Sequence, residues 1–150
     1  MRAPDEVAYR IALAEGFLAE AEQDLKRWRS CVDNAQLSVE NAGKAVLSLF
    51  SVSPKTHEPS QQLAALLRDR KLPDEIQDSM RKLLPELLAL GKREHFLTDY
   101  GDEATYTLPW DLFTRDSGDE ALEAARRSLE LSKVIIDRVR ASWNNSPPER

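Results

Sequence analysis

Residues 117–139, SGDEALEAARRSLELSKVIIDRV, decide the fold. Apolar or small side chains recur every three or four residues through this stretch, which keeps them on one face of a helix. That stripe consists of Leu122, Ala125, Leu129, Ser132, Ile136 and Val139. Ser117 and Glu120 are spaced as in a capping box. We therefore predict a long amphipathic helix that begins at Ser117 and ends near Trp143.

The same spacing occurs twice at the beginning of the chain. One apolar stripe runs through residues 7–28 and a second through residues 32–49. We expect two helices packed antiparallel, with the break near Arg29 and Ser30. Ser30 or Asp33 would cap the second helix, because short polar side chains bond the free amides of a helix start.

The middle of the chain predicts two more helices and a loop. Pro59 suits the first turn of a short helix through Leu67. A longer helix begins at Pro73 and Asp74, is kinked by Pro85, and ends at Tyr100. Periodicity then disappears over residues 101–116, where several aromatic side chains crowd together. We expect this loop to pack against the bundle, since so much aromatic surface is unfavourable in water.

Composition agrees with an all-α fold. The chain has 150 residues, of which 41% are hydrophobic and 31% charged, and only five are glycine. That length suits one compact domain with a core. We predict an antiparallel bundle of about five helices in a single domain over residues 1–143, followed by a loose polar tail over residues 144–150.

Several classes of function are disfavoured. The net charge of −5 gives no general attraction for DNA, and the five glycines lie too far apart for a phosphate-binding loop. His57 and His95 are isolated, and Cys31 is the only cysteine, so we predict no metal site, no cofactor and no disulfide. No apolar run is long enough to span a membrane, and we expect a cytoplasmic protein.

Two polar groups carry alternative interpretations. Gln36, Glu40 and Lys44 share one helical face, which is either a surface row with an ion pair or a functional track. Residues 55–58, Lys-Thr-His-Glu, offer a cation, a hydroxyl and an imidazole that suit a phosphate, although such loops also cap helices.

Taken together, these segments resemble the HEPN family of helical nucleotide-binding domains. Residues 35–45, with Ala-Gln followed by Glu and Lys at four-residue steps, resemble its second-helix signature. The Lys-Thr-His loop at residues 55–59 follows, and the Tyr-Gly-Asp segment at residues 100–103 with Pro-Trp-Asp-Leu-Phe at residues 109–113 resembles the segment before its last helix. The resemblance spans about residues 7–143.

Many members of that family are metal-independent ribonucleases with an arginine, a polar residue, a histidine and a tyrosine on one helix. On this chain Arg93 takes the arginine position, Thr98 the histidine position and Tyr100 the tyrosine position. A threonine hydroxyl is no general base near neutral pH, so its presence should remove most acid–base catalysis, commonly worth about 10² to 10⁴ in rate. His95 lies three residues earlier, about 60° around the helix, and would be the substitute base in an active enzyme.

The resemblance implies a homodimer, often beside a nucleotidyltransferase partner protein, that binds nucleotides in some members. Our leading hypothesis is a non-catalytic domain that binds a nucleotide or RNA end, in a toxin–antitoxin-like pair. The alternatives are a ribonuclease toxin that uses Arg93 and His95, and a helical interaction scaffold. On the leading hypothesis the phosphate contacts are Lys44, Lys55, His57 and Arg93, with Tyr100 or Trp110 stacking on a base.

Overall fold

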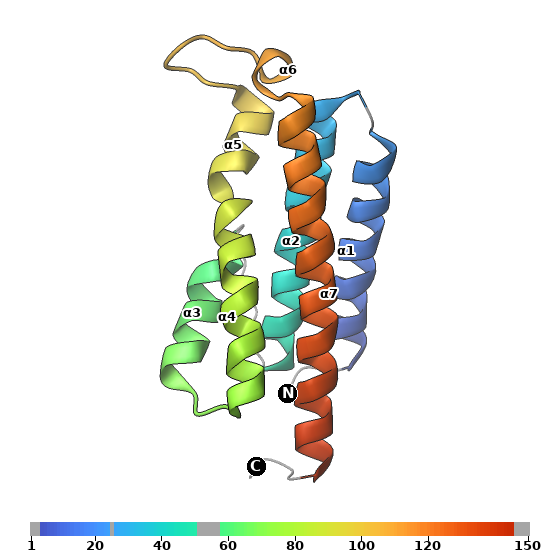
Figure 1. Cartoon of the computed structure of the whole chain (residues 1–150), viewed down its shortest axis with the longest axis vertical. Helices are drawn as coiled ribbons and strands as arrows, with labels where there is room; N and C mark the ends of the chain where they lie inside the picture. The colour runs from blue at the N-terminus through green and yellow to red at the C-terminus, as the bar shows by residue number, and fades with distance from the viewer. Residues whose placement is uncertain (1–3, 25, 51–57, 146–150) are drawn as a thin grey trace.

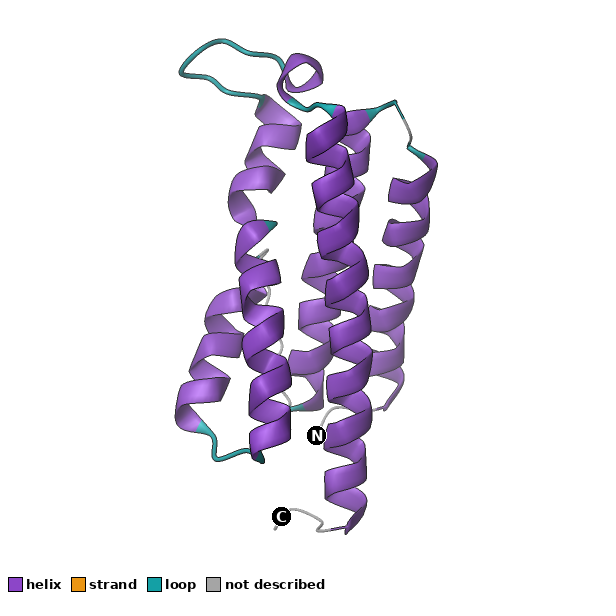
Figure 2. Cartoon of the chain, viewed as in Figure 1, coloured by secondary structure: helices purple, strands orange, loops and turns teal. Residues whose placement is uncertain are grey.

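The computed structural model describes residues 4–24, 26–50 and 58–145, and these form a helical bundle (Figure 1). The helices are α1 (Pro4–Gln23), α2 (Trp28–Leu49), α3 (Pro59–Asp69), α4 (Asp74–Ala89), α5 (Lys92–Tyr100), α6 (Pro109–Leu112) and α7 (Arg115–Asn145). Within these ranges there is no strand, only an isolated bridge between Asp102 and Thr107 (Figure 2). The predicted all-α bundle is confirmed. Helix α7 extends two residues into the predicted tail, and residues 146–150 lie outside the described part.

Helix α2 is the centre of the bundle, because it packs against all six other helices. Its apolar side chains are excluded from solvent almost all the way round, as for Val39, Val46 and Leu47. A helix that is apolar or small on every face is stable only when it is buried. Helices α1 and α7 pack against α2 and against each other, and α4 packs against α7 (Figure 1).

The break between the first two helices lies earlier than the sequence predicted. Helix α1 ends at Gln23, and the Asp24 carboxylate then accepts hydrogen bonds from Arg27 at 3.1 Å and Asn34 at 2.9 Å. Helix α2 starts at Trp28, so Ser30 and Asp33 lie inside it and neither caps it. The prediction was wrong because the buried Asp24 organises the turn through bonds that depend on the packed bundle.

The predicted long helix over residues 74–100 is interrupted, but not at Pro85. Helix α4 continues through Pro85 and ends at Ala89. Pro85 has no backbone N–H, so the Arg81 carbonyl lacks its usual helix hydrogen bond. Both residues are exposed, so water can solvate that carbonyl. The chain breaks at Gly91 instead, and the Gly91 amide donates to the Glu94 carboxylate at 3.2 Å.

Helix α7 begins two residues before Ser117. The Thr114 hydroxyl accepts a bond from the Ser117 amide at 3.3 Å, and the Ser117 hydroxyl accepts one from the Thr114 amide at 3.2 Å. The capping box therefore consists of Thr114 and Ser117, and the predicted box of Ser117 and Glu120 is wrong. Gly118 lies inside the helix, where a Cβ would be 2.5 Å from the Trp28 ring.

The loop before α6 is held by its backbone. Asp102 and Thr107 exchange two backbone hydrogen bonds of 2.9 and 3.0 Å, and Gly101 takes a φ of 70° that suits glycine. Tyr106 is 93% exposed and Trp110 is 70% exposed. The expectation that the aromatic residues would be packed was therefore wrong for these two. None of the described helices is both long and apolar enough to cross a membrane.

Candidate functional site

Thr98, which the resemblance places at the histidine position, is completely buried on α5. Its hydroxyl donates to the His95 carbonyl at 2.9 Å and lies 3.4 Å from the Asp33 carboxylate of α2. A side chain at this position therefore points into the bundle and not toward solvent. A buried hydroxyl bonded to its own helix has neither the pKa nor the access that a general base needs.

His95 belongs to a charged network that joins α5 to α2. Its Nε2 lies 3.7 Å from one oxygen of Asp99, and the Arg29 guanidinium lies 3.7 Å from the other oxygen. Arg29 also donates through Nε to the Thr98 carbonyl, and it stands 5.9 Å from the centre of the Trp110 ring. The network fixes the end of α5 and the position of Trp110. Its imidazole–carboxylate pair is partly open to water.

Aromatic side chains line the outer face of α5. Phe96 is 50% exposed and Tyr100 is 62% exposed, and their ring centres are 6.1 Å apart. The Lys92 ammonium lies 5.9 Å from the centre of the Phe96 ring. Residues four apart share a helical face, so Lys92, Phe96 and Tyr100 form one ridge. Exposed rings beside a cation are the chemistry that stacks on unpaired bases.

Arg93 points elsewhere. It is exposed and lines a groove between α5 and α7 in which carboxylates outnumber arginines. Among the described residues it has no ion pair. Its surroundings are unfavourable for a phosphate, because like charges repel.

The polar track on α2 is buried, contrary to the interpretation as a surface row. Gln36 is fully enclosed, and its amide donates to Glu40 at 3.5 Å. Lys44 lies 3.2 Å from the other oxygen of Glu40, and both side chains are nearly excluded from solvent. The reason is that α2 is surrounded by other helices. The Lys44 charge is already compensated, and the predicted phosphate contacts Lys55 and His57 lie outside the described residues.

The structure thus brings Tyr100, Trp110 and His95 to one end of the bundle and leaves Lys44 and Arg93 apart. Arg29, Phe96 and the pairing of Asp99 with His95 were not predicted from the sequence. The four-residue spacing of His95 to Asp99 was visible there. The role of Arg29 was not, because it depends on the contact between α2 and α5.

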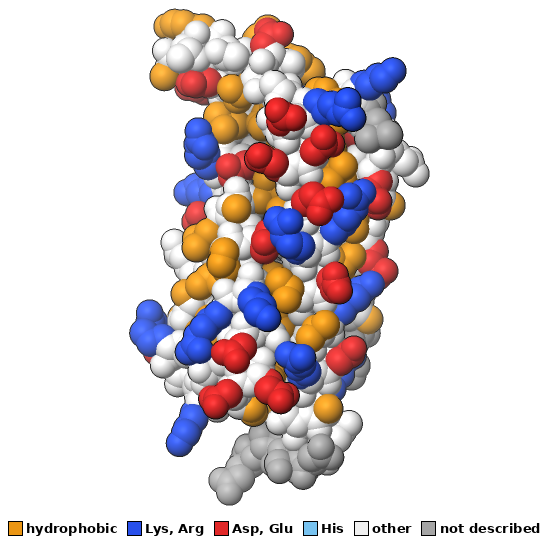
Figure 3. Space-filling view, viewed as in Figure 1, with side chains coloured by type: hydrophobic (Ala, Val, Ile, Leu, Met, Phe, Trp, Pro, Cys, Tyr) orange, Lys and Arg blue, Asp and Glu red, His pale blue; other side chains and the backbone are white. Residues whose placement is uncertain are grey.

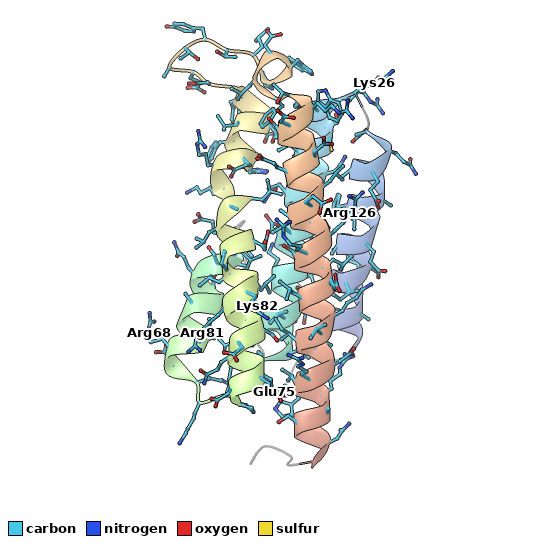
Figure 4. The ribbon with its side chains drawn as sticks, viewed as in Figure 1. Lys26, Arg68, Glu75, Arg81, Lys82 and Arg126 are labelled. Carbon is cyan, nitrogen blue, oxygen red and sulfur yellow. The ribbon has the colours of Figure 1, made fainter. Side chains whose placement is uncertain are left out.

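A second group of cations lies at the other end of the bundle. Figure 4 labels Arg68 on α3 and Arg81 and Lys82 on α4. Arg68 lies 3.1 Å from Asp69, and Arg81 lies 3.6 Å from Asp78. Both arginines are paired with carboxylates, so this group is a mixed-charge surface rather than a basic patch.

In the part of the chain that the structure describes, no three histidine, cysteine or acidic side chains gather as a metal site would need. The Asp102 carboxylate accepts the Ala104 amide at 3.0 Å and so stabilises a turn. Cys31 is buried, and burial together with Asp24 and Asp119 raises the pKa of its thiol to about 11. Such a thiol is protonated and inert near neutral pH.

Known proteins resemble this chain along most of its length. The model of the HEPN domain matches residues 7–135. A protein of Methanocaldococcus jannaschii named "Putative toxin MJ1304" is 25% identical over 144 residues, which cover 88% of this chain and 93% of that protein. The crystal structure of TT1696 from Thermus thermophilus superposes with a TM-score of 0.65 at 20% identity, covering 86% of this chain and 97% of that one.

The solved structure supports the fold alone, since its identity to this chain is low. The domain match is more informative, because it includes α2, with its Gln36, Glu40 and Lys44 track, and α5, with its arginine-to-tyrosine segment. This chain belongs to the HEPN family.

Proposed function

We propose that this protein is a HEPN domain that binds a nucleotide or an RNA end without cleaving it. The observation that carries the proposal is the position of Thr98. It replaces the family's catalytic histidine, and it is buried against Asp33 with its hydroxyl bonded to the His95 carbonyl. The helix that would carry the catalytic base therefore lacks one at that position.

Binding is supported by the end of α5. Phe96, Tyr100 and Trp110 are exposed rings, and Lys92 and Arg29 are cations next to two of them. Stacking on aromatic rings contributes about 1–3 kcal/mol per base and tolerates any sequence. Lys92 supplies the phosphate contact at this end of α5. The candidate residues Lys55 and His57 lie outside the described part of the chain and stay predictions from the sequence.

The test is calorimetric titration of the protein with each ribonucleotide and with a short single-stranded RNA. Tyr100→Ala and Trp110→Ala should each weaken binding by roughly tenfold, as the loss of one stacked base predicts. Tyr106→Ala is the matched control, because Tyr106 lies in the loop between α5 and α6 and is 93% exposed. No heat of binding at millimolar ligand, or an equal loss of affinity in the Tyr106→Ala control, would refute the proposal.

A ribonuclease is the second candidate, and one observation favours it. The His95 imidazole lies 3.7 Å from the Asp99 carboxylate and is partly open to solvent. A carboxylate can orient an imidazole as a general base. Labelled RNA is incubated with the protein, with His95→Ala and with Arg93→Ala. Cleavage that disappears in these variants makes the protein an enzyme, and unchanged cleavage identifies a contaminant.

The toxin-like assignment rests on the name of the Methanocaldococcus jannaschii relative and on family membership. We infer that the protein forms a homodimer and acts in a pair with a nucleotidyltransferase in the cytoplasm. Co-expression of this chain with a nucleotidyltransferase encoded beside it, followed by co-purification, tests the pairing. An interaction scaffold is the third hypothesis. The exposure of the Trp110 ring favours it, because an exposed aromatic ring can complete a protein interface.

A further inference from the structure

Helices α5 and α7 diverge above the end of α4 and leave a groove between them. Helix α4 packs along α7, but the chain breaks at Gly91, and α5 then packs against α2 and α6. Among the described residues α5 makes no helix contact with α7. A bidentate pair between Arg127 and Glu86, at 2.8 and 3.2 Å, joins the two sides at the lower end.

The groove has a volume of about 690 Å³, and its floor is apolar. It is lined by Val32, Leu90, Leu97, Phe113, Ala121 and Ala124. The two alanines matter most, because their short side chains on α7 leave the space that a larger residue would fill. Known ligand sites enclose about 300–1,000 Å³, so the groove can accept several side chains.

The rim carries mainly negative charge. Its carboxylates are Glu86, Glu94, Asp119, Glu120 and Glu123, and its cations are Arg93 and Arg127. Five negative charges and two positive charges leave a net charge of −3 on the lining. Two arginines outside the lining partly offset it, because Arg115 lies 3.7 Å from Asp119 and Arg126 lies 3.3 Å from Glu123. Acidic side chains are visible along the upper part of α7, beside hydrophobic ones in the seam between the helices (Figure 3). An anionic occupant such as RNA is repelled by this rim.

We propose that the groove binds a cationic amphipathic helix of a partner protein. Along α7 the lining runs from Ser117 to Arg127, ten residue steps of 1.5 Å, or about 15 Å. That length matches about three helical turns, whose apolar residues at three- and four-residue spacing enter the groove. Lysine or arginine residues flanking this stripe pair with Glu120 and compete with Arg126 for Glu123, which lies 3.3 Å from Arg126. Charge complementarity thus selects the partner, and apolar burial holds it.

The probe is a fluorescein-labelled, helix-forming peptide with leucine at those spacings and lysine on both flanks. Its binding is measured by fluorescence anisotropy. A peptide with glutamate in place of lysine and a scrambled peptide of the same composition are the controls. We expect the lysine peptide alone to bind, with an affinity that falls as salt is added.

Two double variants separate the rim from general charge. Glu120→Lys with Glu123→Lys should weaken binding roughly tenfold, because two rim pairs become repulsive. Glu130→Lys with Asp137→Lys makes the same charge change at exposed positions farther along α7, outside the groove lining, and should leave affinity unchanged. Ala124→Leu, which fills the groove, should also weaken the peptide. Circular dichroism verifies that each variant is folded.

Four outcomes would overturn the proposal. The first is no binding of the lysine peptide at millimolar concentration, and the second is equal binding of the glutamate or scrambled peptide. The third is equal weakening of binding by both double variants. The fourth is that spermidine displaces the peptide at low salt while Ala124→Leu still binds the peptide fully, which indicates a small-amine site. Sedimentation velocity adds a fifth. If the rim variant changes the oligomeric state, the groove is an interface between copies of this chain.

Discussion

Alanine in place of Gly118 and alanine in place of Gly16 should have opposite effects on stability. Both glycines lie inside helices, where alanine is favoured by about 1 kcal/mol. A Cβ on Gly16 meets no atom within 4 Å, so Gly16→Ala should stabilise the protein by about 0.5–1 kcal/mol. A Cβ on Gly118 would lie 2.5 Å from Trp28 Cε3 and 3.1 Å from Cζ3.

The cost at Gly118 follows from that contact. Ordinary contact begins at 3.4 Å, so the Trp28 ring must move by 3.4 − 2.5 = 0.9 Å. A rigid ring packed against the core resists this movement, and overpacking commonly costs about 1–3 kcal/mol. After the helix-propensity gain, Gly118→Ala should destabilise the protein by about 1 kcal/mol. The two variants should then differ by about 2 kcal/mol, or about 4–8 °C in Tm for a chain of this size.

The assay is urea unfolding followed by circular dichroism, with Trp28→Leu and the Gly118→Ala, Trp28→Leu double variant included. Because leucine removes the clashing ring, the double-mutant cycle should give a coupling of about 1 kcal/mol or more. If Gly118→Ala is as stabilising as Gly16→Ala, or if the cycle shows no coupling, then the close approach of Trp28 does not explain the glycine.

Three further predictions concern single contacts. Arg29→Ala removes the bond to the Thr98 carbonyl and the contacts with Asp99 and Trp110. The free energy of unfolding should fall by about 1–2 kcal/mol, and hydrogen exchange in the loop before α6 should become faster. An unchanged exchange rate in this loop would contradict the role of the network. Thr114→Ala removes the α7 cap and should cost about 1 kcal/mol in urea unfolding. Thr105→Ala, which removes only an exposed hydroxyl–hydroxyl bond to Thr107, should cost less. The raised pKa of Cys31 keeps its thiol protonated in the folded state up to about pH 11, while the thiol of the unfolded chain ionises near pH 9.0. The free energy of unfolding should therefore fall between these pH values by about 3 kcal/mol relative to Cys31→Ala. Rapid reaction of the folded protein with a thiol reagent at neutral pH would refute the burial of Cys31.

The groove and the aromatic end of α5 lie on different sides of the same helix and differ in charge. Lys92, Phe96 and Tyr100 form an outer ridge with a cation beside exposed rings. Arg93, Glu94 and Leu97 line the acidic groove. A nucleotide and a cationic partner helix would therefore occupy separate faces of α5. Binding of the nucleotide can then be tested in variants of the groove, and binding of the helix in variants of the aromatic ridge.

Ionic contacts hold α7 to its neighbours without deciding where it packs. Arg126 projects from α7 toward α1 (Figure 4), where it lies 3.0 Å from Glu22. Both side chains are about half exposed. Exposed ion pairs contribute little, about 0–1 kcal/mol, so the apolar stripe of α7 positions the helix.

Apolar periodicity and composition determined by themselves that this chain is an all-α bundle, since a stripe at three- and four-residue spacing can be buried only by a neighbouring helix. The order of residues also determined the family resemblance, which places Thr98 at the histidine position. These features are local, and each can be read from a short stretch of sequence.

Only the tertiary structure decided which polar groups are accessible. Gln36, Glu40 and Lys44 resemble a surface row in sequence, yet they are buried because α2 is surrounded by other helices. Arg29 meets Asp99 across 70 positions of the chain, as 99 − 29 shows, and no spacing rule predicts such a contact. The helix ends differ for another reason. Short-range bonds at Asp24, Gly91 and Thr114 set them, and the sequence offered competing caps at Ser30, Asp33 and Ser117.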